Sequence, residues 1–364
     1  MSNEKFNTAR TALENVSSEE QAIFSRKYDK ITGAINHDRI SIASFRTDPP
    51  ETADFILDES FENRQTGQVT KQQYRTPQER MNADSSSEHY VETRIQANSP
   101  SIRQAKALEY IFGIGVKTGN WLGVKADSRA TTVFDDSHNK IDEIITIADE
   151  DESVLPFGID VTIATNPATV QEKLQKSHNS PATRLPEGCS RIIYYEHDGD
   201  KRSLPVIPRY VVSISGGFVE SIVRSNIQVS PAGIIDVAGQ GSQRMLNTRY
   251  RILSELYAQA EMRLNQLQLT PSEEQTNLEA DALEAIGIQK GIFDLALANI
   301  EKALAESSPS LKWLRAADLR TELTKRSMES DRAYATLMQE VEAMNKAALN
   351  KHLGRQTMAI ASHA

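Results

Sequence analysis

The spacing of apolar residues divides the chain into helical ends and a central stretch of strands. Apolar residues recur at helical spacing over residues 4–35, with a second helix start at Ser17-Ser18. Polar and turn-forming residues dominate residues 46–100, which we expect to be a flexible linker or arm. After Gly241 the pattern is helical almost to the last residue, which predicts an antiparallel hairpin or bundle of helices.

Between residues 101 and 240 the apolar density rises and the repeat shortens to that of β-strands. The pattern predicts one helix over 101–116 and another over 167–177, which begins after Asn166 with a proline at its first position. The polar run Asp135–Asn139 predicts a hairpin turn between two strands. Strands that alternate with these helices, as in an α/β sandwich, are predicted over 131–134, 140–147, 157–164, 191–195 and 209–214.

These patterns divide the chain into four segments. The last predicted helix begins near Met328, runs to Leu353 and ends at Gly354, because glycine commonly follows a helix C-terminus. The segments are N-terminal helices over 1–45, the linker or arm over 46–100, the α/β core over 101–240, and an all-α C-terminal region over 241–364.

Composition narrows the functional classes. The 364 residues leave room for two or three domains, and 41 basic residues against 50 acidic residues give a net charge of −9. That balance argues against a protein that wraps nucleic acid with a wholly basic surface, although a local basic groove is compatible with it. The single cysteine, Cys189, excludes a disulfide framework and any zinc site that needs two thiolates. The sequence contains neither a long apolar span nor a secretory signal, so we expect a cytoplasmic protein without membrane contact.

Two carboxylates interrupt the central apolar strands. Asp142 and Asp160 lie in successive predicted strands, so antiparallel pairing would bring them side by side, where they would favour a divalent cation. With equal weight, both could instead be exposed polar residues of a half-solvated sheet. Glu109 lies on the helix stripe that includes Phe112 and should face the sheet, or else sits at its edge with its carboxylate in water.

The order of elements, taken together with these carboxylates, resembles the PD-(D/E)xK, or restriction-endonuclease-like, nuclease superfamily over about residues 101–215. That family has an αβββαβ core, with an acidic residue in the first helix, an aspartate on the second strand and a (D/E)-x-Lys motif on the third. The resemblance implies that Asp142 and Asp160 hold Mg²⁺ or Mn²⁺, with Glu109 assisting. The metal would polarise a scissile phosphate and activate a water molecule.

One position departs from this family's pattern. Thr162 stands where the family has its lysine, and a neutral hydroxyl cannot offset negative charge on a phosphate as a cation does. Ile141 also replaces the proline before the first aspartate. Lys173, in the next predicted helix, is the best relocated candidate for the missing cation, and Lys140 is a weaker one. Without such a lysine the core would be a degenerate scaffold that binds without cutting.

Three functions remain open from the sequence. The first is a metal-dependent phosphodiesterase or nuclease acting on nucleic acid, with DNA favoured over RNA. The second is a catalytically degenerate binding or assembly protein that uses its C-terminal helices for protein contacts or self-association. The third is a partly disordered structural or secreted effector-like protein. A lysine amine close to both aspartates would favour the first. A phosphate-contacting flank or, for most of them, simply a solvated surface would account for Arg202, Arg209, Arg224, Arg244, Arg249 and Arg251.

Overall fold

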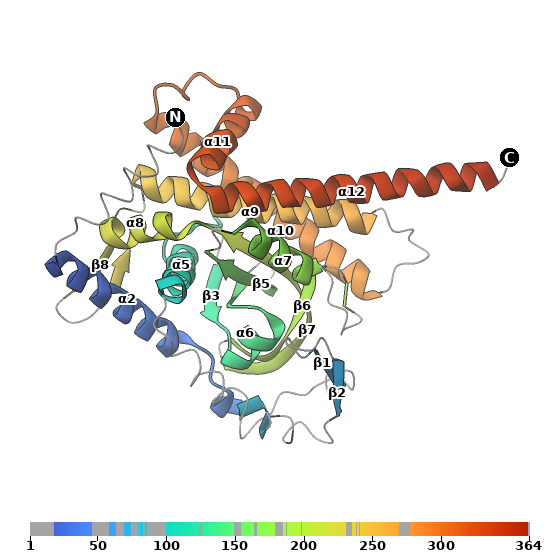
Figure 1. The fold of residues 1–364 in the computed structure, drawn as a ribbon, viewed down its shortest axis with the longest axis horizontal. Helices are drawn as coiled ribbons and strands as arrows, with labels where there is room; N and C mark the ends of the chain where they lie inside the picture. Colours follow the sequence, from blue (N-terminus) through green and yellow to red (C-terminus); the bar gives the residue numbers. More distant parts are fainter. Residues whose placement is uncertain are drawn as a thin grey trace.

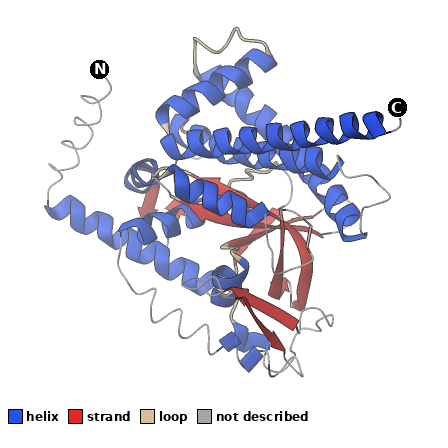
Figure 2. Ribbon diagram, turned by 45° about the vertical axis from the view of Figure 1, so that its right-hand side comes forward, coloured by secondary structure: helices blue, strands red, loops and turns tan. Residues whose placement is uncertain are grey.

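The structure is a computed structural model with a mixed β-sheet at its centre and helices on both sides of it (Figures 1 and 2). It describes residues 18–45, 58–62, 69–73, 79, 81–82, 84–85, 100–123, 126–148, 154–163, 166–178, 185–186, 188–197, 199–230, 235–237, 239, 241–268 and 277–362. The protein is thus an α/β protein with a helical C-terminal region, as the sequence predicts.

The central sheet has five strands. They are β3 (Ala126–Ala130), β4 (Glu143–Ala148), β5 (Val154–Thr162), β6 (Cys189–His197) and β7 (Asp200–Ser213). Their spatial order is β3-β4-β5-β7-β6, in which β5 and β7 run parallel and the other neighbours run antiparallel. Because β5 and β7 lie in the middle of the sheet, their near-continuous apolar sequences fit strands that are covered on both faces.

Helices from distant parts of the sequence cover the sheet. They are α2 (Ser18–Asp38), α5 (Pro100–Lys117), α7 (Pro167–His178), α8 (Gly216–Asn226), α9 (Gln243–Gln268), α10 (Asn277–Ser307), α11 (Ala316–Ser330) and α12 (Arg332–Ser362). Side chains alternate between the two faces of a strand. Accordingly, Ile159 and Tyr210 belong to the large core shared with α5 and α10, whereas Val211 packs with Val170 and Leu174 of α7.

The C-terminal helices are part of the same packing. The large hydrophobic cluster takes residues from α2 and α5, from the sheet, and from α9, α10 and α11. Helix α12 crosses the molecule beside α9, and its C-terminal part extends beyond the rest of the chain (Figure 1). None of the described helices is long and apolar enough to cross a membrane.

The predicted strand over 131–134 is wrong. Residues Val133–Asn139 form a short helix, α6, and the strand before it is β3. The hydroxyl of Thr132 accepts a hydrogen bond from the Asp135 amide at 3.0 Å, and Asp135 and Asp136 lie in the first turn, where the helix dipole favours negative charge. The predicted hairpin turn is therefore a helix, because the polar residues that form turns also cap helices.

Two further predictions differ from the structure. The last helix does not begin near Met328, because Asp331 separates α11 from α12 and accepts hydrogen bonds from the amides of Ala333 and Tyr334. Nor does it end at Gly354, which lies within α12. Within the predicted linker, β1 (Asp58–Glu62) and β2 (Val69–Gln73) pair antiparallel. Most of that linker, and the predicted helix before residue 18, lie outside the described residues.

Candidate active site

Asp142, the residue before β4, contacts the strand that carries Asp160. The antiparallel ladder between β4 and β5 ends where Glu143 pairs with Ile159. The Asp142 amide donates to the Ile159 carbonyl at 2.8 Å, and the Asp142 carboxylate Oδ2 accepts the Val161 amide at 2.6 Å. Asp142 is the residue before β4 rather than within it, so its side chain can turn back to the neighbouring strand.

Two cations bind the carboxylate of Asp160. Lys173 of α7 places Nζ 2.6 Å from Oδ1 and also donates to the Val161 carbonyl at 2.7 Å. Arg209 of β7 donates from Nη2 to Oδ2. Burial alone would raise the pKa of Asp160, but the two cations lower this pKa below its ordinary value. Asp160 is therefore a buried anion at neutral pH.

A second group of charges surrounds Glu109. Lys106, one turn earlier on α5, lies 2.6 Å from a Glu109 carboxylate oxygen and 3.8 Å from Asp136 of α6. Arg39, just after α2, donates to the same Asp136 oxygen at 3.2 Å. Burial raises the pKa of Glu109, and Lys106 offsets only part of this effect. For Asp136 the balance is reversed, because Lys106 and Arg39 outweigh burial and lower its pKa.

Asp142 lies between these two groups. Its pKa is raised well above the ordinary value, first by burial and then by the negative charges of Glu109, Asp136 and Asp160. Asp142 also shares a hydrogen bond with Asp136, which a protonated carboxyl can donate. The cluster therefore combines an excess of carboxylates around Asp142 with an excess of cations around Asp160.

The structure separates the two candidate lysines. Lys173 reaches Asp160, whereas the Nζ of Lys140 donates to the Ser137 carbonyl at the end of α6. Thr162 is buried at the end of β5, on the same face as Asp160, and lies opposite Ser213 of β7. Of the residues predicted from the sequence, Glu109, Asp142, Asp160 and Lys173 come together, and Lys140 does not.

Sequence reasoning missed three members of the cluster, Arg39, Lys106 and Asp136. The only available signal was the position of Lys106 one turn before Glu109 on the same helix face. Arg209 was predicted as one of several surface arginines but is buried against Asp160. The other members of that set bind elsewhere, through the pairs Arg202–Asp200, Arg224–Glu220 and Arg251–Asp331 and through bonds from Arg244 and Arg249 to the carbonyls of Ser221 and Trp121.

The donor set suits a hard divalent cation, although the side chains are not arranged around one. Among the described residues, no three histidine, cysteine, aspartate or glutamate side chains form a ready metal-binding group. Mg²⁺, however, is commonly held by one or two carboxylates together with water and substrate phosphates. Asp142 and Asp160 supply two such carboxylates, and the unfavourable charge on Asp142 is one that a cation would relieve.

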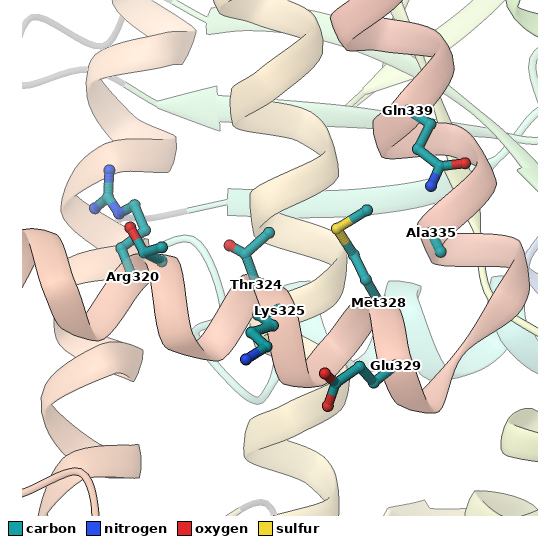
Figure 3. A pocket seen from close by; sticks show the side chains of 8 residues that line it. Arg320, Thr324, Lys325, Met328, Glu329, Ala335 and Gln339 are labelled. Atoms are coloured by element: carbon teal, nitrogen blue, oxygen red, sulfur yellow. The ribbon is translucent and has the colours of Figure 1, made fainter.

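A cavity of about 620 Å³ lies elsewhere, between α11 and α12 (Figure 3). Figure 3 shows Arg320, Thr324 and Met328 on one helix and Gln339 on the other. Arg320 is already bound to Glu301 at 2.6 Å. None of the clustered carboxylates lines this cavity, so it is separate from the candidate site.

Comparisons of this chain with family models, with curated proteins and with solved structures find no match. A functional interpretation therefore depends on the geometry of the cluster itself.

Proposed function

We propose that this chain is a metal-dependent phosphodiesterase that cleaves nucleic acid, with DNA favoured over RNA, on a core of the PD-(D/E)xK kind. Asp142 and Asp160 would hold Mg²⁺ or Mn²⁺ with Glu109 beside them, and Lys173 would supply the cation that Thr162 lacks. The bound metal would polarise the scissile phosphate and lower the pKa of the attacking water.

The position of Lys173 is the observation that carries this proposal. Its amine lies 2.6 Å from an Asp160 carboxylate oxygen, and the negative charge of Asp160 raises the pKa of Lys173 in spite of burial. A lysine bound to one of the two aspartates favours a cleaving site over a degenerate one. Because α7 is the element after β5, its Lys173 would act at the end of β5 in place of a lysine at position 162.

The order of elements also supports the proposal, with two changes from the predicted order. The first strand is β3 instead of residues 131–134, and the last is β7 instead of β6, which holds residues 191–195. With α6 and β6 treated as additions, the chain then runs in the αβββαβ order from α5 to β7. Asp142 precedes the second of these strands and Asp160 lies in the third. Glu109 and Asp160 therefore lie on the elements that carry acidic residues in the proposed family, and Asp142 lies one residue before such an element.

Metal binding and cleavage can be tested on the full chain. We expect Mn²⁺ or Mg²⁺ to raise the unfolding temperature, because a ligand at a hundred times its Kd stabilises the native state by about 2.7 kcal/mol. Asp142→Asn should abolish this shift and the cleavage of labelled DNA. Asp200→Asn is the matched control, since Asp200 is an exposed aspartate of β7. Cleavage that persists in both Asp142→Asn and Asp160→Asn would contradict the proposal.

One observation favours the alternative, a catalytically degenerate binding protein. Both carboxylate oxygens of Asp160 already have cationic partners, Lys173 and Arg209, which could replace a metal permanently. In that case Mn²⁺ would leave the unfolding temperature unchanged, while nucleic acid or protein binding would persist. The metal titration thus separates the two functions before any cleavage assay is made.

A further inference from the structure

The Arg209 guanidinium binds Asp160 and leaves one of its own hydrogen-bond donors unused. Its side chain is only 6% exposed and lies beside Asp160 on the strand parallel to β5. Nη2 donates to Asp160, but the adjacent Nε is buried and has no hydrogen-bond partner in the part of the chain that the structure describes. Nε and Nη2 form one edge of the guanidinium, a fork that matches two oxygens of a phosphate.

The charges around Arg209 favour an anion. Lys173 and Arg209 together outnumber the single carboxylate of Asp160, whereas Asp142 is surrounded by other carboxylates. The second oxygen of Asp160 is taken by Lys173, so this carboxylate does not occupy both positions of the Arg209 fork. A buried Nε without a hydrogen-bond partner costs free energy, and an anion with several oxygens would supply this partner.

We propose that Arg209 is a phosphate-binding residue of this site. A divalent cation and a nucleic-acid phosphate then replace the Arg209–Asp160 ion pair, the cation on Asp160 and the phosphate on Arg209. The inference rests on the proposed function and deepens it. Asp160 releases the guanidinium when a cation takes its carboxylate, and the freed fork binds a phosphate of the nucleic-acid strand. In the free protein the ion pair gives each of the two buried charges an opposite charge beside it.

This exchange predicts effects of opposite sign in one variant. Arg209→Gln removes a competitor for Asp160, so the affinity for Mn²⁺ should increase. The same change removes two charge-assisted hydrogen bonds to phosphate, so the affinity for DNA should fall roughly tenfold to a hundredfold. A residue with a merely structural role would weaken both kinds of binding or neither.

The experiment uses the full chain with Mn²⁺ in one titration and a fluorescein-labelled DNA duplex in another. DNA affinity is measured in EDTA and in Ca²⁺ over a series of salt concentrations. Losing one phosphate contact should lower the slope of log affinity against log salt by about 0.9. Arg209→Lys, which keeps the charge without the fork, should recover part of the DNA affinity. Arg202→Gln is the matched control, because Arg202 lies on the same strand in an exposed ion pair.

The outcomes separate this inference from the proposed function. An unchanged DNA affinity and salt slope in Arg209→Gln would overturn the inference, and so would an absence of DNA binding by the unchanged protein. If the unchanged protein binds no Mn²⁺, the proposed function and the exchange both fail. If it binds Mn²⁺, and binds DNA in Ca²⁺ with an affinity that Arg209→Gln does not change, the inference alone fails and the proposed function stands. If Arg209→Gln unfolds, Arg209→Lys carries the test, because this variant keeps the charge and loses the fork; a DNA affinity in Ca²⁺ equal to that of the unchanged protein would overturn the inference.

Discussion

Lys173 supplies a positive charge to a carboxylate on a strand that carries no lysine of its own. Asp160 and Thr162 lie two residues apart on one face of β5, so a lysine at position 162 would point to the same side as the carboxylate. Thr162 is neutral, and the cation that binds Asp160 comes from Lys173 of α7. The cation and the carboxylate therefore come from different elements, so the proposed chemistry would depend on the packing of α7 against β5.

Replacement of Lys173 tests whether this lysine acts in place of a lysine at position 162. We expect Lys173→Ala to reduce DNA cleavage about a hundredfold or more, the usual cost of removing a group that stabilises charge in a transition state. Mn²⁺ affinity should be kept or increased, because the lysine competes for Asp160. In the double variant Lys173→Ala, Thr162→Lys, the restored lysine should recover part of the rate. Lys346→Ala, at an exposed ion pair on α12, is the control.

At the scale of elements, side chains of α9 make the hydrogen bonds to the edge of β7 that a neighbouring strand would otherwise make. β6 pairs with β7 only as far as Pro208, which leaves the same edge of β7 open beyond that point. Gln259 accepts the Val211 amide at 2.9 Å and donates to the Val211 carbonyl at 2.7 Å. Glu255 accepts the Ser213 amide at 3.0 Å. Buried backbone groups need such partners, so α9 is required by the strand that carries Arg209.

The buried carboxyl of Glu255 should make stability depend on pH. Burial raises its pKa well above the ordinary value, and the Ser213 amide offsets only part of this effect. The folded state therefore keeps a proton that the unfolded chain loses above about pH 4.3, so stability falls as pH rises from there toward the folded pKa. Glu255→Gln cannot lose this proton.

As pH rises from about 4 to about 8, we expect the free energy of unfolding of Glu255→Gln to increase relative to that of the unchanged protein. Urea unfolding across this range measures the difference. Other carboxyls with raised pKa values, such as Asp135, are present in both proteins and cancel. Glu261→Gln, at a half-buried position of the same helix, is the control. A difference that does not change with pH would show that Glu255 is ionised in the folded state.

The sequence predicted those parts of the fold that depend on local patterns. Helices over 101–116 and 167–177 and the helical C-terminal region are confirmed, because their apolar periodicity is continuous. The strand over 131–134 was predicted wrongly because Val133 and Phe134 favour strands, while the cap formed by Thr132 favours a helix. The contribution of Arg39 to the cluster could not be predicted, since it depends on how α2 packs against residues far away in the sequence.

At the scale of the whole molecule, the sheet and the C-terminal helices share one core. Phe293 of α10 contacts Phe157 of β5 and Tyr210 of β7, with ring centroids 5.6 and 5.5 Å apart. Tyr210 also donates to Gln289 of α10 at 2.7 Å. Tyr210 directly follows Arg209 on β7, and Phe157 precedes Asp160 by three residues on β5. Helix α10 thus packs against both strands of the candidate site, although it follows β5 by more than a hundred residues in the sequence.

Truncation of Phe293 should therefore destabilise the sheet as well as the helix that carries it. We expect Phe293→Ala to lower the free energy of unfolding by about 3–5 kcal/mol, because the lost ring leaves a cavity among buried aromatic residues. Hydrogen exchange should accelerate in β5 and α10 together. Leu295→Ala, at a side chain 57% exposed on the same helix, should change stability by less than about 0.5 kcal/mol. If exchange accelerates in α10 while β5 keeps its protection, the C-terminal helices would be an independent unit that unfolds separately from the site.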